Sequence, residues 1–177
     1  MVDPWKNTYR ICGKYIADYR TAVDIGCRSG DFAQHLCPEF EQVVGYDFRA
    51  KPAHVRKLFE RTSDNFTFHN VGLGEAEYVT RSNEKAGRIK GEGNTEVPIH
   101  TLDSYDLKDV DFIKIDVEGF EPKVLMGAEQ TIKKYWPVLC IEINTDDNNA
   151  QEIVEGWGYV LKEIDNIQNH DYVFVKE

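Results

Sequence analysis

Residues 21–30 have the sequence Thr-Ala-Val-Asp-Ile-Gly-Cys-Arg-Ser-Gly. The first five form a short run rich in β-branched residues, typical of a strand, and the glycines at 26 and 30 indicate a tight turn after it. Residues 31–37 then predict a helix. The start of a helix offers unpaired N–H groups that bind ligands. The same pattern also occurs as a purely structural turn, so by itself it does not establish binding.

Strand-like and helix-like segments alternate along most of the chain, which predicts an α/β fold with a mostly parallel sheet and helices on both faces. Beyond residues 21–25, the expected strands are 42–46, 65–71, 111–115 and 138–143. Pro52 and Pro122 suit the first turns of two further helices. Two last strand-like runs, 159–164 and 172–175, predict an antiparallel hairpin at the sheet edge.

The length of 177 residues favours a single domain. Apolar residues at three- and four-residue spacing predict an N-terminal helix within residues 1–19, followed by a core over 20–145. Residues 146–177 are expected to supply a short helix and the edge strands. Within the core, residues 75–98 lack a helix signal, and we interpret them as a flap with two strands, a candidate substrate lid.

The chain carries 31 acidic and 21 basic residues, a formal net charge of -10, which argues against binding long nucleic acid through its phosphates. One basic cluster is an exception, and we interpret it as a solvated helix face. It consists of Arg49, Lys51, Arg56, Lys57 and Arg61.

No apolar run reaches the roughly 18 residues of a membrane span. The first ten residues lack the apolar core of a secretory signal, so we expect a cytoplasmic protein. The four cysteines stand far apart, without the spacing of a zinc site or a disulfide framework.

Acidic residues follow two of the predicted strands. Asp47 ends the second strand, about 20 residues after the glycine turn, where a carboxylate can accept both hydroxyls of a ribose. A dinucleotide site would normally have glycine at the position of Arg28, so the pattern favours an adenosine-containing ligand without phosphates. Asp116 ends a central strand, where open α/β sheets bind ligands. For Glu121 we prefer a structural role at a helix start.

These segments resemble the FkbM family of S-adenosylmethionine-dependent methyltransferases. The resemblance covers roughly residues 22–144 and is strongest over 101–144. There three stretches match the family pattern in order. They are Thr-Leu-Asp, then Asp-Phe-Ile-Lys-Ile-Asp-Val-Glu-Gly-Phe-Glu-Pro-Lys-Val-Leu-Met-Gly-Ala, then Pro-Val-Leu-Cys-Ile-Glu-Ile-Asn. It implies a Rossmann-like class I methyltransferase fold with a seven-stranded sheet. It also implies methyl transfer to a hydroxyl oxygen of a sugar or a similar small molecule.

The resemblance also implies roles for individual residues. Asp24, Gly26 and Gly30 would line the methionine end of the cofactor, Asp47 would hold the ribose, and the adenine would lie near residues 70–71. The candidate cofactor-binding residues are Asp24, Gly26, Cys27, Arg28, Gly30, Asp47, Phe48, Asn70 and Val71. The candidate catalytic residues, which would align the acceptor hydroxyl and remove its proton, are Asp116 and Glu118, with Glu142 and His100 behind them.

Two positions depart from the family pattern. The family usually has Gly-Ala-Asn where this chain has Gly26-Cys27-Arg28, and it has Glu-Pro where this chain has Asp47-Phe48. Asp47 keeps the carboxylate that ribose binding requires. For Arg28 three interpretations remain, in order of preference: it pairs with the methionine carboxylate, it points away, or it marks altered cofactor handling.

Asp116, Glu142 and Asn144 end adjacent predicted strands, and their oxygens could hold Mg²⁺, as in catechol-type methyltransferases. We favour a reaction without a metal, because the spacing is permissive. Two alternative functions stay open: a non-catalytic module that binds S-adenosylmethionine or a nucleoside, and a methyltransferase acting on nucleic acid. The second lacks support, because residues 116–119 are Asp-Val-Glu-Gly instead of the Pro-Pro-aromatic motif of base methyltransferases. The sequence identifies neither the acceptor nor the oligomeric state.

Overall fold

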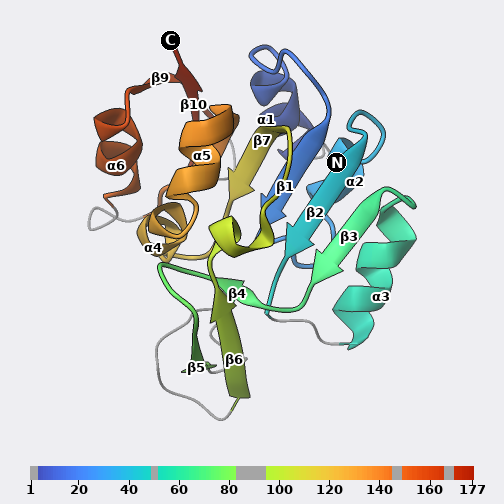
Figure 1. Ribbon diagram of the computed structural model, residues 1–177. Coiled ribbons are helices and arrows are strands. Elements are labelled where there is room, and N and C mark those ends of the chain that lie inside the picture. The colour runs from blue at the N-terminus through green and yellow to red at the C-terminus, as the bar shows by residue number, and fades with distance from the viewer. Residues whose placement is uncertain (1–3, 49–51, 83–94, 145–148, 166–169) are drawn as a thin grey trace.

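The computed structural model describes residues 4–48, 52–82, 95–144, 149–165 and 170–177 (Figure 1). The strands of the large sheet are β1 Thr21–Ile25, β2 Gln42–Tyr46, β3 Phe66–His69, β7 Val110–Ile115, β8 Val138–Glu142, β9 Tyr159–Asp165 and β10 Asp171–Lys176. A small sheet contains β4 Gly72–Leu73, β5 Tyr78–Ser82 and β6 Thr95–His100. The helices are α1 Pro4–Cys12, α2 Ala33–Leu36, α3 Pro52–Arg61, α4 Glu121–Met126, α5 Glu129–Tyr135 and α6 Ala150–Gly156, with a 3₁₀ helix, η1, at Leu102–Tyr105.

The seven strands of the large sheet have the order β3-β2-β1-β7-β8-β10-β9. The first five are parallel, and β10 pairs antiparallel with both β8 and β9. The expected mostly parallel sheet with an antiparallel C-terminal hairpin is therefore confirmed. The chain order reverses between β1 and β7, and open α/β sheets bind ligands beyond the carboxyl ends of the strands at such a point.

Helices cover both faces of the sheet and bury a separate core on each (Figure 1). On one face η1, α4, α5 and α6 pack on the sheet through residues such as Leu102, Leu125, Ile132 and Val154. On the other face α1, α2 and α3 pack through residues such as Cys12, Leu36 and Leu58. In the part of the chain that is described, no helix has both the length and the apolarity needed to cross a membrane.

The small sheet lies beyond the carboxyl-terminal edge of the parallel strands (Figure 1). Its strands β5 and β6 pair antiparallel, as expected for the two strands of the flap, and β4 adds to β6 in parallel. The middle of the predicted flap, residues 83–94, lies outside the described residues. The flap therefore arises beside the edge of the sheet where a ligand is expected.

The predicted lengths of three elements are wrong. The first helix ends at Cys12 instead of continuing toward residue 19, because Gly13 is a weak helix former and the next bonds are of the i to i+3 type, from Lys14 to Ile11 and from Tyr15 to Cys12. The second helix covers only Ala33–Leu36, because the preceding residues belong to the glycine turn. The third strand ends at His69, and the chain then leaves the large sheet to form β4.

The helix expected after Pro122 is divided into α4 and α5. A Cβ atom on Gly127 would lie 1.9 Å from the carbonyl oxygen of Gly74, so glycine allows the chain after β4 to press against the break. The carboxylate of Asp103 then accepts hydrogen bonds from the backbone amides of Gln130 and Thr131, at 3.1 and 2.8 Å. Asp103 thus supplies the cap that α5 lacks at Ala128.

Candidate functional site

The glycine turn after β1 is pressed against the end of β7. Gly26 has φ +88° and Gly30 has φ +77°, which are conformations that glycine adopts without strain. A Cβ atom on Gly26 would lie 1.8 Å from the carbonyl oxygen of Asp116. Glycine at position 26 is therefore required both by the backbone conformation and by the close approach of the two strand ends.

Asp47 holds the same turn from the side of β2. One of its carboxylate oxygens accepts a 2.9 Å hydrogen bond from the backbone amide of Arg28, which itself has φ +45°. Asp47 is only 4% exposed, whereas the side chain of Arg28 is exposed. The acidic residue and the turn, which were predicted to work together, are thus in direct contact.

A shallow hollow opens between the turn, the end of β2 and strand β4. Its lining is mostly apolar, with the carboxylate of Asp47 among the polar groups. It is lined by Ile25, Gly26, Tyr46, Asp47, Phe48, Val71, Gly72, Leu73, Val117 and Phe120. The structure therefore brings together four of the predicted residues, at positions 26, 47, 48 and 71. Asn70 is exposed and does not line this hollow.

A second shallow hollow also borders Gly26 and is lined by several charged residues. It is lined by Trp5, Asp24, Gly26, Cys27, Arg28, Asp31, Phe32, Lys114 and Asp116. It brings four further predicted residues together, at positions 24, 27, 28 and 116. Gly30 lines neither hollow, and it lies against Leu58 of α3 instead.

Lys114 lines the charged hollow of the candidate site, and the sequence analysis did not single it out. It sits in the central strand β7 with its side chain only 2% exposed, in register with Asp24 of β1 and Cys140 of β8. Its ammonium group lies 2.9 Å from Asp116 and 4.8 Å from the ring centre of Trp5. Burial lowers its pKa, but the surrounding carboxylates, led by Asp116, outweigh this effect and raise the pKa above its usual value. A lysine within the apolar run at the end of a central strand was the available signal.

Carboxyl groups around Lys114 have pKa values that are raised well above their usual range. Burial raises the pKa of Asp24 to about 7, and one of its oxygens is buried without a hydrogen-bond partner among the described residues. Burial and the adjacent carboxylate of Asp116 also raise the pKa of Glu142. Buried carboxyls close to one another cannot all ionise, so this region holds protons at neutral pH.

The loop after Asp116 is fixed by Glu121. This buried carboxylate accepts hydrogen bonds of 3.1 Å from the backbone amides of Val117 and Gly119. Glu121 thus has the structural role that the sequence analysis preferred. It supports the loop after Asp116 in addition to lying at the start of α4. Glu118 lies at the tip of that loop with φ +60°, is partly exposed, and lines neither hollow.

The other candidates line neither hollow. The ring of His100 bonds the hydroxyl of Tyr105 at 2.8 Å, and Asn144 bonds His170 at 3.3 Å. Glu142 faces Asp116 and Asn144, the set considered for Mg²⁺. Within the described residues, no group of three or more His, Cys, Asp or Glu side chains is arranged to hold a metal ion.

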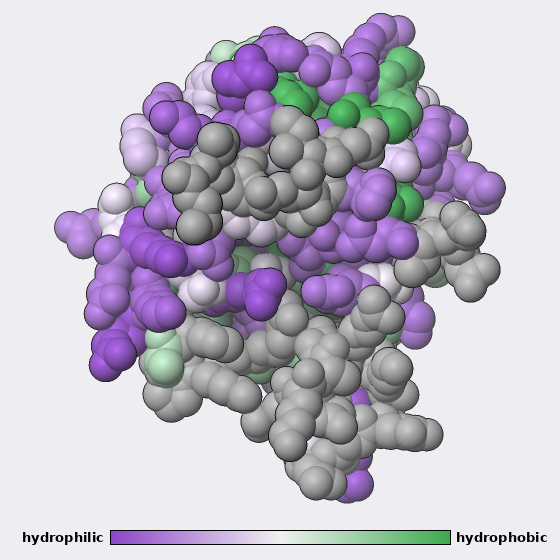
Figure 2. All heavy atoms as spheres, turned by 180° about the vertical axis from the view of Figure 1, so that it is seen from behind, coloured by the Kyte–Doolittle hydropathy of each residue, from purple (hydrophilic) through white to green (hydrophobic). Residues whose placement is uncertain are grey.

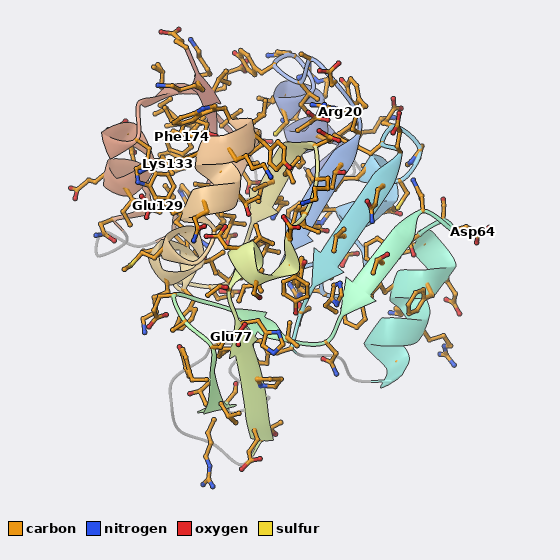
Figure 3. All side chains as sticks on the ribbon, viewed as in Figure 1. Arg20, Asp64, Glu77, Glu129, Lys133 and Phe174 are labelled. Carbon is orange, nitrogen blue, oxygen red and sulfur yellow. The ribbon has the colours of Figure 1, made fainter. Side chains whose placement is uncertain are left out.

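The site can be located in the figures by its surroundings. Glu77 lies on the side of the small sheet, near the carboxyl-terminal edge, whereas Arg20 lies at the opposite end of the strands (Figure 3). There Arg20 is bonded to Asp111. The ion pair of Arg20 and Asp111 is therefore remote from the two hollows.

Comparison with known proteins identifies a family. The family model described as "Methyltransferase FkbM domain" matches residues 24–174. No curated protein matches the sequence. The residues matched by the family model include the glycine turn, Asp47 and the whole segment around Asp116.

Solved structures share the fold at low sequence identity. A methyltransferase FkbM from Methylobacillus flagellatus has a TM-score of 0.68 and 19% identity, with 97% of this chain and 48% of that one covered. This chain thus spans about half the length of that protein. An rRNA methylase from Streptococcus thermophilus has a TM-score of 0.58 and 13% identity, with coverage of 98% and 97%. TrmK from M. capricolum, solved with S-adenosylhomocysteine, has a TM-score of 0.56 and 13% identity, with coverage of 96% and 66%.

Proposed function

This chain belongs to the FkbM methyltransferase family, and on that premise we propose that it transfers the methyl group of S-adenosylmethionine to a hydroxyl oxygen of a sugar or another small molecule. The observation that carries the cofactor assignment is the pair of hollows on either side of Gly26, one apolar and one charged. S-adenosylmethionine has the same division, with an aromatic base at one end and an ammonium and a carboxylate at the other.

The apolar hollow suits the adenosine part. Phe48 and Val71 offer apolar surface to the base, and the carboxylate of Asp47 offers acceptors to the ribose hydroxyls. Asp47 also accepts from Arg28, so the group proposed to bind ribose is held in place before the ligand arrives. Asn70, which is exposed and directly follows β3, is proposed to contact the edge of the adenine.

The charged hollow suits the methionine part. Asp24 has a buried oxygen that finds no hydrogen-bond partner among the described residues, which fits an ammonium donor. The exposed guanidinium of Arg28 lines the same hollow and fits the methionine carboxylate. This is the first of the interpretations given above for the departure from the family pattern at that position. Cys27 and the backbone around Gly30 complete the turn that carries these groups.

When bound, the cofactor supplies an electrophilic methyl group on a sulfonium. Asp116 is proposed to orient the acceptor hydroxyl and to accept its proton, because it ends the central strand between the two hollows and is held by Lys114 at 2.9 Å. Glu118 stays a candidate for contact with the acceptor, because it is partly exposed on the loop that follows Asp116.

The first experiment is calorimetric titration of S-adenosylmethionine and S-adenosylhomocysteine into the chain, into Asp47→Ala, and into Asp64→Ala as a control. Asp64 is exposed and lies at the turn after α3, away from the site (Figure 3). We expect micromolar binding by the unmutated chain and by the control, and a loss of at least tenfold in Asp47→Ala. Circular dichroism of each variant establishes that it is folded.

The second step separates an enzyme from a binding module. Transfer of radiolabelled methyl from S-adenosylmethionine to a panel of hydroxylated small molecules, with tRNA and rRNA fragments as competing acceptors, would identify the class of acceptor. Binding without transfer to any acceptor would favour a non-catalytic module. Labelling confined to the RNA fragments would replace the small-molecule assignment.

A further inference from the structure

The basic residues that cluster around α3 do not form a uniform solvated face. Arg56 is 74% exposed and faces Glu60 at 3.6 Å, one helical turn along α3, which is an ordinary surface pair. Arg61 is 34% exposed and turns back toward residues 29–31. Arg49 and Lys51 lie outside the described residues. In Figure 2, which views the molecule from behind, the side on which α3 lies is largely hydrophilic.

Arg61 binds the glycine turn at two points. One nitrogen of its guanidinium donates a 3.2 Å hydrogen bond to the carbonyl oxygen of Ser29, and it also pairs with the carboxylate of Asp31. The hydroxyl of Ser29 donates to the other oxygen of Asp31 at 2.9 Å. Ser29, Asp31 and Arg61 therefore form a closed polar contact at the carboxyl-terminal side of the turn.

Apolar packing brings the same part of α3 onto the turn. Leu58, one helical turn before Arg61, is fully buried. A Cβ atom on Gly30 would lie 2.9 Å from a methyl carbon of Leu58, so the turn rests directly on the helix. Residues three apart on a helix share a face, which places the apolar and the charged contact side by side.

The turn is thus held at both ends by one segment of the chain. Asp47, at the end of β2, binds its front half through the amide of Arg28, and Arg61, at the end of α3, binds its rear half. Strand β2 and helix α3 follow each other in the sequence. Asp31 and Arg28 both line the charged hollow, so Arg61 also balances a carboxylate that faces the proposed methionine position.

We propose that Arg61 is a positioning residue for cofactor binding, which fixes the glycine turn through Ser29 and neutralises Asp31. This inference rests on the proposed function, because it assigns the turn to S-adenosylmethionine. Arg61 acts through the turn and does not itself contact the cofactor. Without its guanidinium, the turn would lose its contact through Ser29, and Asp31 would present a negative charge that repels the carboxylate of the ligand.

The test is calorimetric titration of S-adenosylhomocysteine into the full chain and into three single variants. Arg61→Met removes the cation and keeps most of the apolar stem, and Arg61→Lys keeps a cation. Arg56→Met is the matched control, because it removes an arginine of the same helix that pairs with Glu60, and no contact with the turn is seen among the described residues. We expect at least a tenfold loss of affinity in Arg61→Met, recovery to within about threefold in Arg61→Lys, and less than a twofold change in Arg56→Met.

A double variant distinguishes positioning from general destabilisation. If Arg61 acts in part by neutralising Asp31, then adding Asp31→Asn to Arg61→Met should restore part of the lost affinity, because it removes the uncompensated negative charge. Thermal unfolding of each variant is recorded in parallel, without ligand. An Arg61→Met variant that unfolds at a lower temperature but binds S-adenosylhomocysteine normally would overturn the inference, and leave the proposed function intact. No binding by the unmutated chain would overturn both.

Discussion

The backbone amide of Arg28 donates a 2.9 Å hydrogen bond to the carboxylate of Asp47. This bond joins the turn after β1 to the end of β2, the two segments whose glycines and acidic residue predicted an adenosine-containing ligand. Arg28 replaces a residue that the family usually has as asparagine, yet the contact uses only its backbone. The departure at this position therefore changes the side chain that faces the charged hollow and leaves the anchoring of the turn intact.

Gly26 should tolerate no side chain. In Gly26→Ala, the new Cβ would lie 1.8 Å from the carbonyl oxygen of Asp116 at φ +88°, so we expect a loss of at least about 3 kcal/mol in the free energy of unfolding. Gly119→Ala has an equally positive φ of +99° but no atom within 4 Å, and should lose only about 1 to 2 kcal/mol. Urea denaturation of both measures the difference. Equal losses would show that backbone strain alone, and not the close approach to β7, determines the cost.

Asp103, which lies in η1, should cap the start of α5, a helix later in the chain. Its removal in Asp103→Ala leaves the amides of Gln130 and Thr131 without their acceptor, and we expect a loss of about 1 to 2 kcal/mol in stability. Asp64→Ala, at an exposed turn, should change stability by less than about 0.5 kcal/mol. Chemical denaturation is the measurement. A cost no larger than that of the control would mean that α5 needs no cap from η1.

Asp24 should make stability fall as pH rises. Burial raises its pKa from 3.8 to about 7, so in this window the folded chain binds a proton that the unfolded chain has released. Its contribution is fully present below about pH 4 and is lost as pH approaches 7. Asp24→Asn, which cannot ionise, should therefore gain stability relative to the unmutated chain from pH 4 to 7, by up to about 1 kcal/mol per pH unit.

Glu163→Gln is the control of opposite sign. Hydrogen bonds from Lys14 and Tyr15 lower the pKa of Glu163, so its contribution is present at neutral pH and is lost as pH falls. Denaturation curves at several pH values compare the two variants. A difference between Asp24→Asn and the unmutated chain that stays flat across this range would contradict the buried, protonated carboxyl.

Lys114 should be essential to the fold as long as its partners keep their charges. Lys114→Met leaves Asp116 and nearby carboxylates buried without a cation, and we expect a loss of about 3 to 5 kcal/mol. Adding Asp116→Asn should recover part of that loss, because it removes the uncompensated charge. Lys133→Met is the control: Lys133 faces Glu129 on the exposed side of α5 (Figure 3), and its loss should cost less than about 1 kcal/mol. Thermal unfolding measures the loss of stability in each of the three variants.

The order of strands and helices was largely predictable from the sequence, because apolar periodicity and glycine or proline positions are local signals. The split of the helix after Pro122 was not, because it depends on the approach of Gly74 to Gly127 from a segment more than fifty residues earlier. The length of the first helix was misjudged for a related reason. Tyr15, Ile16 and Tyr19 pack on the same core as α1, so their spacing reported burial and not helical backbone.

The candidate site shows the same division. The sequence by itself determined that a glycine turn, Asp47 and Asp116 end strands of one parallel sheet, and parallel strands bring their carboxyl ends to one edge. Only the tertiary structure decided that Gly26 separates an apolar hollow from a charged one, that Lys114 neutralises Asp116, and that Arg61 of α3 binds the turn. The physical reason is that periodicity records which residues are buried, whereas the partner of a buried charge is set by strand register and helix packing between segments distant in the chain.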